Sequence, residues 1–531
     1  MKKALRLVVF VFFLTALVTQ VAASAPAQPD WSMSGQNVTN WRSQPYETKI
    51  GTNDVGTLVK KWAFTTGGDV SATPAVTGGA VYFPDWAGNL YKLNAKTGQV
   101  IWQNSLPALT GVPGTFSRST PTLYGDYVLV GTQRGANLLA FNKDTGALLW
   151  KTQIDRQPFA VLTQSPLVYK GIAYIGVSSS EEIAPLFIPG YVCCVFRGNF
   201  NAVDIATGNV LWKTYTTPDN GGQPGGYSGV AVWGSTAVYD TKRNSIYITT
   251  GNNYAVPASV SACEAQQSTT NTAPCDAANN YVDAVLALDP GSGAVKWADK
   301  LQGYDAFTIA CVPFFFDPSN CPNPAGPDFD FGQGAMLIPT VSAGQSQDVL
   351  AAGQKSGVFW GIDPSTGKVL WATNAGPGGS LGGMEWGSAT DGSRIYYAVS
   401  NNYGIPYKLI DGVTTTTGGL WGALDPATGK ILWQTADPNG AIDAGAVSVA
   451  NGVVYAGSFG FANNTAVAPA KTNPTFFALD ASTGKVLWNY VSGGSVNSGA
   501  AIVNGMVYWG SGYSNLFLGQ GNNQFYAFGL P

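Results

Sequence analysis

A pattern of short apolar strands separated by polar turns recurs along the whole chain. Seven segments follow the formula apolar-x-apolar-[Asp/Asn]-x-x-[Thr/Ser]-Gly-x-x-x-Trp, and they end at Trp102, Trp150, Trp212, Trp297, Trp371, Trp433 and Trp488. In each segment an apolar strand ends at the Asp or Asn, and the Gly supplies the positive φ that the following turn needs. A second hairpin precedes each segment, as at 500–508, where Asn504-Gly505 is a strong hairpin signal. Two hairpins predict one four-stranded sheet in each repeat.

An eighth copy of the pattern is divided between the two ends of the chain. Its tryptophan is Trp62, within 59–64, and its first strand is 525–528. Repeats of this length indicate a propeller or a solenoid, and a repeat shared between both ends indicates a closed ring. We therefore expect an all-β, eight-bladed β-propeller over residues 25–531, closed by pairing of the N- and C-terminal strands. The repeated tryptophans are expected to be structural, because each blade buries its faces only against its neighbours.

The composition agrees with this architecture and argues against a nucleic-acid partner. Only 11% of the 531 residues are charged, 66 are glycine, and the net charge is −3. Such a composition fits short strands joined by tight turns rather than long helices. No basic run is long enough to suggest nucleic-acid binding, so no nucleic-acid partner is expected.

Residues 1–24 have the layout of a secretory signal. Basic residues at the start precede the apolar stretch 7–18, which is too short to span a bilayer comfortably, and 21–25 offers small residues for cleavage. A membrane anchor is the alternative interpretation. We expect a mature protein without a membrane span, in the periplasm or secreted.

The cysteines and the absence of histidine limit the chemistry further. Six cysteines suit an oxidising compartment, and proximity suggests the pairs Cys193 with Cys194, Cys263 with Cys275, and Cys311 with Cys321. For the adjacent pair, two independent cysteines are the alternative. The absence of histidine excludes a Ser-His-Asp triad, a His-ligated zinc site and covalent haem of the Cys-x-x-Cys-His kind. A general base must therefore be a carboxylate, Lys, Tyr or Cys.

The longest intervals between successive tryptophans run from Trp212 to Trp297 and from Trp297 to Trp371, and they contain four of the six cysteines. Because functional loops of a propeller gather on one face, these two intervals are expected to carry the site.

The chain resembles the quinoprotein alcohol dehydrogenases, which bind pyrroloquinoline quinone (PQQ) beside a metal ion on the propeller axis. The resemblance covers about residues 31–531 and rests on the tryptophan pattern together with the stretches 191–198, 353–357 and 382–387. These stretches are most similar to the polyvinyl-alcohol dehydrogenase branch. The tryptophan pattern alone is weak, since non-enzymatic propellers share it.

The resemblance implies a set of cofactor contacts. A Cys193–Cys194 disulfide would cover one face of the quinone, and Trp233 would lie against the other by offset stacking. Core packing is the alternative for Trp233. Thr163 is implied as a quinone contact. Arg118 is implied to meet a quinone carboxylate, with a surface role as its alternative.

Lys355 stands where many relatives carry Arg near the quinone carbonyl. A cation there would stabilise the oxyanion of the reduced quinone, although Lys is a point charge rather than a planar fork. Glu385-Trp386 falls where relatives often show Asn-Trp. This departure leaves the pair outside the expected site.

A metal ion is implied as well, held by oxygen atoms as a hard cation requires. The ligands would be Glu181, with Glu182 as an adjacent alternative, Asn252, and Asp328, which would also act as the base. Asp330 resembles the additional carboxylate of lanthanide-using relatives, so we expect calcium, with a lanthanide as the alternative. Individually, each of these residues is also compatible with an ordinary turn or strand end.

The resulting expectation is an exported dehydrogenase that transfers hydride from an alcohol to PQQ. The substrate would be a secondary alcohol or polyvinyl alcohol, and an external acceptor such as a cytochrome c would take the electrons, because the chain has no haem motif. Two alternatives are a non-catalytic propeller scaffold of the outer-membrane assembly type and a PQQ-dependent sugar or aldehyde dehydrogenase.

Overall fold

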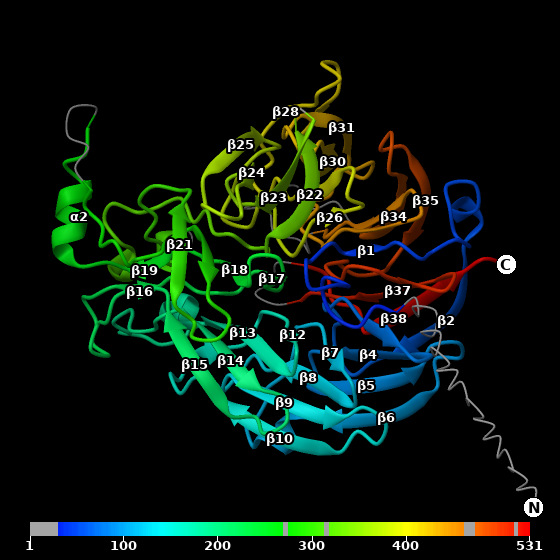
Figure 1. Ribbon diagram of the computed structural model, residues 1–531, viewed down its shortest axis with the longest axis horizontal. Coiled ribbons are helices and arrows are strands. Elements are labelled where there is room, and N and C mark those ends of the chain that lie inside the picture. Colours follow the sequence, from blue (N-terminus) through cyan, green and yellow to red (C-terminus); the bar gives the residue numbers. More distant parts are fainter. Residues whose placement is uncertain (1–29, 269–273, 313–317, 343, 461–472, 515–518) are drawn as a thin grey trace, which may run out of the picture.

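A computed structural model describes residues 30–268, 274–312, 318–342, 344–460, 473–514 and 519–531. Its strands form eight blades of four antiparallel strands each, arranged as a ring (Figure 1), and two of the blades gain a short fifth strand. The predicted eight-bladed β-propeller is therefore confirmed. The expected signal at 1–24 lies outside the described residues. No helix in the described ranges has both the length and the apolar character needed to cross a bilayer.

Each blade is built from four strands that follow one another in the chain, except for the last. The blades are β3 (Ala75–Thr77), β4 (Ala80–Pro84), β5 (Asn89–Asn94), β6 (Val100–Ser105); β7 (Thr122–Tyr124), β8 (Tyr127–Gly131), β9 (Asn137–Asn142), β10 (Leu148–Gln153); β12 (Leu167–Tyr169), β13 (Ile172–Ser179), β14 (Asn199–Asp204), β15 (Val210–Tyr215); β17 (Val238–Asp240), β18 (Ser245–Thr249), β20 (Ala284–Leu288), β21 (Val295–Lys300); β22 (Met336–Ser342), β23 (Gln345–Gly353), β24 (Val358–Ile362), β25 (Val369–Asn374); β26 (Ala389–Thr390), β27 (Ile395–Val399), β30 (Leu420–Leu424), β31 (Ile431–Ala436); β32 (Ser448–Ala450), β33 (Val453–Gly457), β34 (Thr475–Asp480), β35 (Val486–Val491); and β36 (Ala501–Val503), β37 (Met506–Ser511), β38 (Gln524–Gly529), β2 (Val59–Thr65).

Shorter elements lie between these strands. They are β1 (Ser43–Gln44), β11 (Ala160–Val161), β16 (Ser228–Gly229), β19 (Asn253–Ala255), β28 (Tyr407–Lys408), β29 (Thr415–Thr416), the helices α1 (Leu106–Thr110) and α2 (Ala258–Glu264), and the 3₁₀ turns η1 (Val55–Thr57), η2 (Glu181–Leu186), η3 (Ile309–Cys311) and η4 (Pro318–Asn320).

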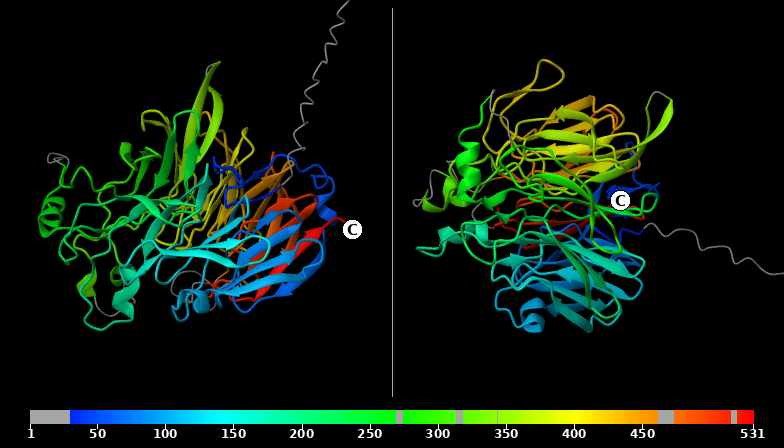
Figure 2. Two further views of the ribbon diagram at one scale, coloured as in Figure 1. Left: turned by 60° about the horizontal axis from the view of Figure 1, so that its bottom comes forward. Right: turned by 60° about the vertical axis from the view of Figure 1, so that its left-hand side comes forward.

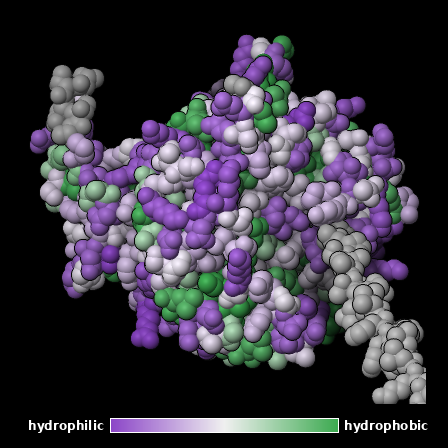
Figure 3. All heavy atoms as spheres, in the orientation of Figure 1, coloured by the Kyte–Doolittle hydropathy of each residue, from purple (hydrophilic) through white to green (hydrophobic). Residues whose placement is uncertain are grey.

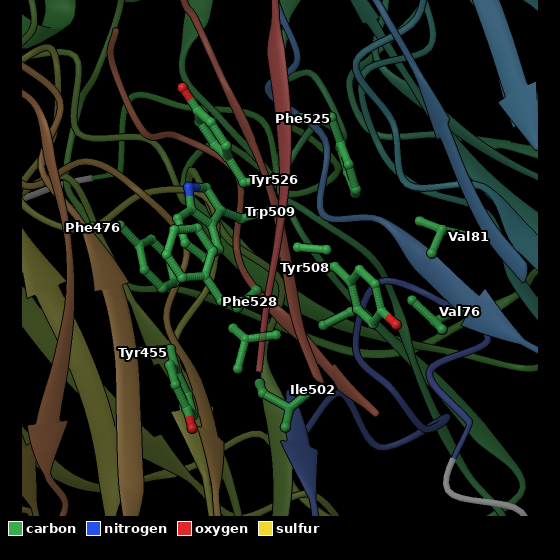
Figure 4. Packing of buried hydrophobic residues seen from close by; sticks show 14 of the residues in the cluster. Val76, Val81, Tyr455, Phe476, Ile502, Tyr508, Trp509, Phe525, Tyr526 and Phe528 are labelled. Carbon is green, nitrogen blue, oxygen red and sulfur yellow. The ribbon is translucent and has the colours of Figure 1, made fainter. Parts of the chain in front are cut away.

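The ring closes through the two ends of the chain, as the sequence predicts. Strand β2 pairs antiparallel with β38, from Val59 opposite Gly529 to Thr65 opposite Gln524 (Figure 1). Aromatic rings hold the closing blade on both sides. Phe476 of the preceding blade stacks on Trp509 with ring centroids 4.0 Å apart (Figure 4), and Phe525 stacks on Phe83 of the first blade at 3.9 Å. Closure therefore combines a strand pair with two aromatic contacts.

The repeated tryptophans dock each blade onto the next. The indole nitrogen of Trp297, for example, donates to the carbonyl oxygen of Pro364 at 3.2 Å, in the turn of the following blade. The glycine of that turn, Gly367, has φ +79°, and a Cβ there would lie 2.7 Å from the Trp297 ring. The expected structural role of these tryptophans is confirmed.

The segment before the first blade crosses the ring. Its backbone bonds to inner strands around the propeller: Ser32 accepts from Leu123, Val38 from Tyr239, Thr39 from Leu337, Trp41 from Thr390, and Arg42 from Val449. The buried guanidinium of Arg42 donates to the carbonyl oxygen of Val447 at 2.8 Å and to the hydroxyl of Thr73 at 2.8 Å. This segment therefore ties the blades together near the axis.

The longest insertions leave the ring from the third, fourth and fifth blades. The arm that carries α2 projects beyond the blades (Figures 1 and 2), and the surface seen in Figure 3 is a mixture of polar and apolar side chains. Disulfides join Cys193 to Cys194, Cys263 to Cys275, and Cys311 to Cys321, as proximity predicts.

Candidate functional site

Three segments run side by side at one end of the ring and bring predicted site residues together. The amide of Gly229 donates to the carbonyl oxygen of Phe196 at 2.9 Å, and the amide of Val230 donates to that of Asn252 at 2.7 Å. The first segment carries the Cys193–Cys194 disulfide, whose peptide bond is cis. Because the second segment leads to Trp233, the disulfide, the indole and Asn252 belong to neighbouring segments.

Lys355 forms the centre of a buried cluster of charges. Its Nζ lies 3.0 Å from Oδ1 of Asp328 and 3.5 Å from Oδ2 of Asp330. Burial alone lowers the pKa of Lys355, but the Coulombic attraction of Asp328 and Asp330 brings it well above its ordinary value. Burial also raises the pKa of Asp328 well above its ordinary value. The charge of Lys355 lowers this pKa, and the charge of Asp330 raises it. The lysine is therefore held as a cation between two carboxyl groups.

Asp330 faces into the site and connects three of its members. Its Oδ2 accepts from Nε1 of Trp233 at 2.8 Å, and its Oδ1 accepts from the backbone amide of Asn252 at 2.6 Å. The ammonium of Lys355 lies 5.4 Å from the centre of the Trp233 ring. The two oxygens of Asp330 thus hold the Trp233 indole and the backbone of Asn252.

Asp328 is held in the left-handed region, with φ +61°. The carboxylate of Asp305 accepts from the amides of Asp328, at 3.0 Å, and Phe329, at 2.6 Å. Burial raises the pKa of Asp305 to about 6, although the amide of Phe329 lowers it. Burial also raises the pKa of the adjacent Asp283 well above its ordinary value, and Asp305 raises it further. Sequence reasoning missed both residues, because neither stands in a recognisable motif.

The two adjacent glutamates of η2 have different surroundings. The buried carboxylate of Glu181 accepts from the amides of Val195, at 2.9 Å, and Phe196, at 2.7 Å. Glu182 instead belongs to the charge cluster. Burial raises the pKa of Glu182 to about 7, Lys355 lowers it, and Asp330 raises it. The resemblance implies Glu181 as the metal ligand. In the structure, however, the Glu181 carboxylate already accepts hydrogen bonds from the loop, so the carboxylate of Glu182 is the more available of the two to a cation.

Arg118 reaches the same end of the ring from the loop before β7. Its guanidinium carbon lies 4.5 Å from the centre of the Trp386 ring, and its Nη1 donates to the hydroxyl of Tyr513 at 2.9 Å. Trp386 in turn meets Trp233 edge to face at 5.6 Å. The Nε of Arg118 is buried and has no hydrogen-bond partner among the described residues. Such a donor would suit an anionic oxygen of a bound ligand.

Glu385, which the sequence leaves outside the expected site together with Trp386, lies beside these residues. A Cβ added to Gly332 would fall 2.9 Å from both Glu385 Cγ and the Trp233 ring. Burial raises the pKa of Glu385, while Lys355 lowers it and Asp330 raises it. The Glu-Trp pair therefore belongs to the site despite its departure from the motif of relatives.

Asn252 and Thr163 complete the expected set. The side-chain nitrogen Nδ2 of Asn252 donates to the carbonyl oxygens of Asn253, at 3.1 Å, and Phe307, at 3.0 Å. The side-chain oxygen is then the remaining polar atom of that side chain. The hydroxyl of Thr163 accepts from Nε2 of Gln133 at 3.3 Å. The described contacts of Thr163 do not connect it to the Lys355 cluster.

The residues present fit a cation and an anionic, flat ligand. Carboxyl groups outnumber basic groups around the site, with Asp283, Asp305, Asp328, Asp330, Glu182 and Glu385 against Lys355 and Arg118. A cation would offset this excess, and oxygen donors are what a hard cation binds. Within the described ranges, no three Asp, Glu or Cys side chains are grouped closely enough to hold a metal ion unaided. A cation would therefore also need other oxygen atoms, such as the amide oxygen of Asn252.

Comparisons with known proteins give a family model and a set of individual relatives. A family model described as outer membrane protein assembly factor BamB matches residues 62–299 and 417–528, and so leaves out the part with Asp328 and Lys355. A polyvinylalcohol dehydrogenase of Sphingopyxis sp. (strain 113P3) is 31% identical over 87% of this chain and 69% of the relative. Another polyvinylalcohol dehydrogenase, of Pseudomonas sp., is 31% identical over 94% of this chain and 75% of the relative.

Among solved structures, the quinohemoprotein alcohol dehydrogenase of Comamonas testosteroni aligns with a TM-score of 0.68 at 20% identity, over 94% of this chain and 80% of the other. At this identity the likeness supports the propeller fold alone.

Proposed function

Because the chain belongs to the quinoprotein alcohol dehydrogenases, on their polyvinylalcohol dehydrogenase branch, we propose that it oxidises a secondary alcohol or polyvinyl alcohol with PQQ. The observation that carries this proposal is the buried pair of Lys355 and Asp328 beside Trp233. It places a carboxylate, a cation and an indole ring around one point.

PQQ would supply the carbonyl that takes up hydride, and a bound cation would add positive charge beside that carbonyl. The protein's own residues have separate tasks. Asp328 would accept the hydroxyl proton of the alcohol at a carboxylate oxygen, and Lys355 favours its ionised form. Trp233 offers a flat face for stacking, held in place by Asp330.

The remaining predicted groups would bind and orient the cofactor. The Cys193–Cys194 disulfide would cover the face opposite Trp233, Arg118 would donate to a carboxylate, and Thr163 would contact the quinone edge. On the metal side, Asn252, Asp328 and either Glu182 or Glu181 would supply oxygen atoms. Electrons would leave to an external acceptor such as a cytochrome c.

The direct test is reconstitution of the purified protein with PQQ and calcium. We expect a shifted quinone absorbance and dye reduction with 2-propanol or polyvinyl alcohol, and less with glucose or acetaldehyde. Preference for a sugar or an aldehyde would replace the alcohol proposal by the alternative within the same cofactor class. Absence of quinone binding would reject the proposal altogether.

The metal is decided by a parallel experiment. Refilling metal-free protein with calcium or with lanthanum, at equal PQQ, compares the two ions directly. We propose calcium, because both oxygens of Asp330 already accept hydrogen bonds from Trp233 and Asn252. Higher activity with lanthanum would assign Asp330 the additional ligand role.

A further inference from the structure

The loop that carries Cys193 and Cys194 is fixed on its C-terminal side by Glu181. This carboxylate accepts from the amides of Val195 and Phe196, the two residues that follow the disulfide. It also accepts from the hydroxyl of Tyr191, which precedes the disulfide, at 2.5 Å. A carboxylate that accepts several hydrogen bonds from one loop restricts that loop strongly. The segment after the disulfide therefore has an anchor within the same blade.

On its N-terminal side the same loop is held from a different part of the chain. The side-chain amide of Asn320 accepts from the backbone amide of Cys193 at 2.8 Å and donates to the carbonyl oxygen of Tyr191 at 2.7 Å. Val192, between these two residues, is 66% exposed. Because this side chain packs little, two contacts hold the backbone leading into the disulfide: the paired hydrogen bonds of Asn320 and the bond from the Tyr191 hydroxyl to Glu181.

Asn320 is itself held by a second disulfide loop. Its backbone carbonyl accepts from the hydroxyl of Thr308 at 2.9 Å. The adjacent Cys321 is bonded to Cys311, the last residue of η3. The Cys311–Cys321 bond therefore joins the two short turns η3 and η4 and limits how far Asn320 could move.

The same insertion is anchored to the metal side of the site. The carbonyl oxygen of Phe307 accepts from the side chain of Asn252, and the amide of Phe307 donates to the carbonyl oxygen of Asn253 at 2.8 Å. From there the chain continues through Thr308 to the Cys311–Cys321 loop. One segment thus connects the predicted metal ligand Asn252 with the backbone of Cys193.

We propose that Asn320, fixed by the Cys311–Cys321 disulfide, is the positioning residue of the Cys193–Cys194 disulfide. In this arrangement Asn320 and the turns η3 and η4 set the height of the adjacent-cysteine bridge above the quinone plane. The part of the proposal that concerns the quinone rests on the proposed function. The clamp on Cys193 stands on the hydrogen bonds alone.

The test measures how fast each disulfide is reduced in the folded protein. Samples are exposed to dithiothreitol, alkylated at intervals and analysed by mass spectrometry, so that Cys193–Cys194 and Cys263–Cys275 are followed in the same molecules. In Asn320→Ala we expect about tenfold faster reduction of Cys193–Cys194 and no change at Cys263–Cys275. Exchange rates depend on access to the sulfur atoms, which the clamp restricts. Affinity for added PQQ should fall about tenfold.

Two further variants guard against misfolding and non-specific effects. Thr308→Val removes the hydroxyl that holds Asn320 and that also accepts from the amide of Ala310, and it should give a smaller acceleration of the same disulfide. Asn439→Ala is the matched control, because Asn439 is another partly buried loop asparagine, bonded to the hydroxyl of Thr475 at 3.1 Å. It should leave both reduction rates unchanged.

The outcomes separate the clamp from the function. Unchanged reduction of Cys193–Cys194 in both Asn320→Ala and Thr308→Val would overturn the clamp. Equal acceleration of both disulfides would also overturn it, because that indicates general loosening. Faster reduction of Cys193–Cys194 alone supports the clamp, whether or not the unmodified protein binds PQQ. Failure of the unmodified protein to bind PQQ would reject the proposed function and leave the clamp standing.

Discussion

The ammonium nitrogen of Lys355 lies 3.0 Å from Oδ1 of Asp328, and the two side chains are only 8% and 6% exposed. A buried pair of this kind is costly to desolvate, and removing one partner leaves an uncompensated charge. Its position at the centre of the site agrees with a chemical role for both residues.

The role of Asp328 as a base predicts the effect of Asp328→Asn. Turnover of the PQQ- and metal-loaded protein should fall about 100- to 10,000-fold, the usual contribution of a general base. Quinone binding should persist, because asparagine retains the shape and one oxygen. Steady-state dye reduction and absorbance titration measure the two quantities. Full turnover in this variant would remove Asp328 as the base.

Stacking on Trp233 predicts weaker quinone binding when the ring is replaced. Trp233→Leu should lower PQQ affinity about tenfold, because aromatic contacts contribute about 0.5–1.5 kcal/mol beyond their area. Trp297→Leu serves as the control, since Trp297 docks one blade onto the next with a comparable indole hydrogen bond. Affinity is read from absorbance titration. An equal loss in both variants would indicate instability rather than a lost stacking partner.

The contrast between Glu181 and Glu182 predicts opposite phenotypes for two neighbouring substitutions. Glu182→Gln should weaken calcium binding to the PQQ-loaded protein about tenfold or more, since it removes a charged oxygen donor. Glu181→Gln should affect calcium less but accelerate reduction of Cys193–Cys194, because its bonds hold that loop. Calorimetric titration with calcium gives the first result. The reverse pattern would make Glu181 the ligand.

The docking of tryptophan onto glycine predicts a stability difference between two Gly→Ala variants. Gly412 has φ +71°, and no atom lies within 4 Å of the position that a Cβ would take, so Gly412→Ala should cost only about 1 kcal/mol of strain. Gly367→Ala adds a clash with Trp297 at 2.7 Å and should cost a further ~1–3 kcal/mol. Guanidinium unfolding measures both. Equal losses would mean that the tryptophan does not press on the turn.

The buried carboxyl group of Asp437 predicts a pH effect on stability outside the site. Burial raises the pKa of Asp437 from 3.8 to about 6, so the folded state binds this proton more tightly than the unfolded chain. Its contribution to the free energy of unfolding is therefore complete below pH 4 and is lost as pH rises to 6, by up to ~3 kcal/mol. Relative to the unmodified protein, Asp437→Asn should gain stability over that range.

Asp411 provides a control of opposite sign for this pH effect. Hydrogen bonds from Thr414 and Val413 lower the pKa of Asp411. Asp411→Asn should therefore lose stability relative to the unmodified protein as pH rises from 3 to 5. Unfolding curves at each pH check both variants. An identical pH profile for Asp437→Asn and the unmodified protein would contradict the assignment.

Much of the ring could be predicted from the sequence because its determinants are local and repeated. The Asp-x-x-Thr-Gly turn and the Trp that follows are each defined within a few residues, and repetition fixes their number. Contacts such as Asp305 with the backbone of Asp328, or Arg42 with Val447, depend on segments that are far apart in the chain. They follow no period, so sequence pattern alone could not predict them.

The site residues also fall into two groups, those that the sequence could predict and those that it could not. Asp328, Lys355, Trp233 and Asn252 could be named because each stands in a stretch that resembles relatives, and the structure brings them together. Which way the side chains of Glu181 and Glu182 point depends on the geometry of η2. That geometry cannot be deduced from the fact that the two residues are adjacent in sequence. Asn320 gave no signal either, because a loop asparagine is usually an ordinary turn residue.

The pairing of β2 with β38 also sets an order of events during synthesis. The outer strand of the last blade is made first, and its three partners are made more than 400 residues later. Seven blades could form from contiguous stretches, whereas the last must wait for the final strand to appear. Until then two unpaired sheet edges face each other across an open gap, and the growing polypeptide must be protected from pairing with the wrong neighbour.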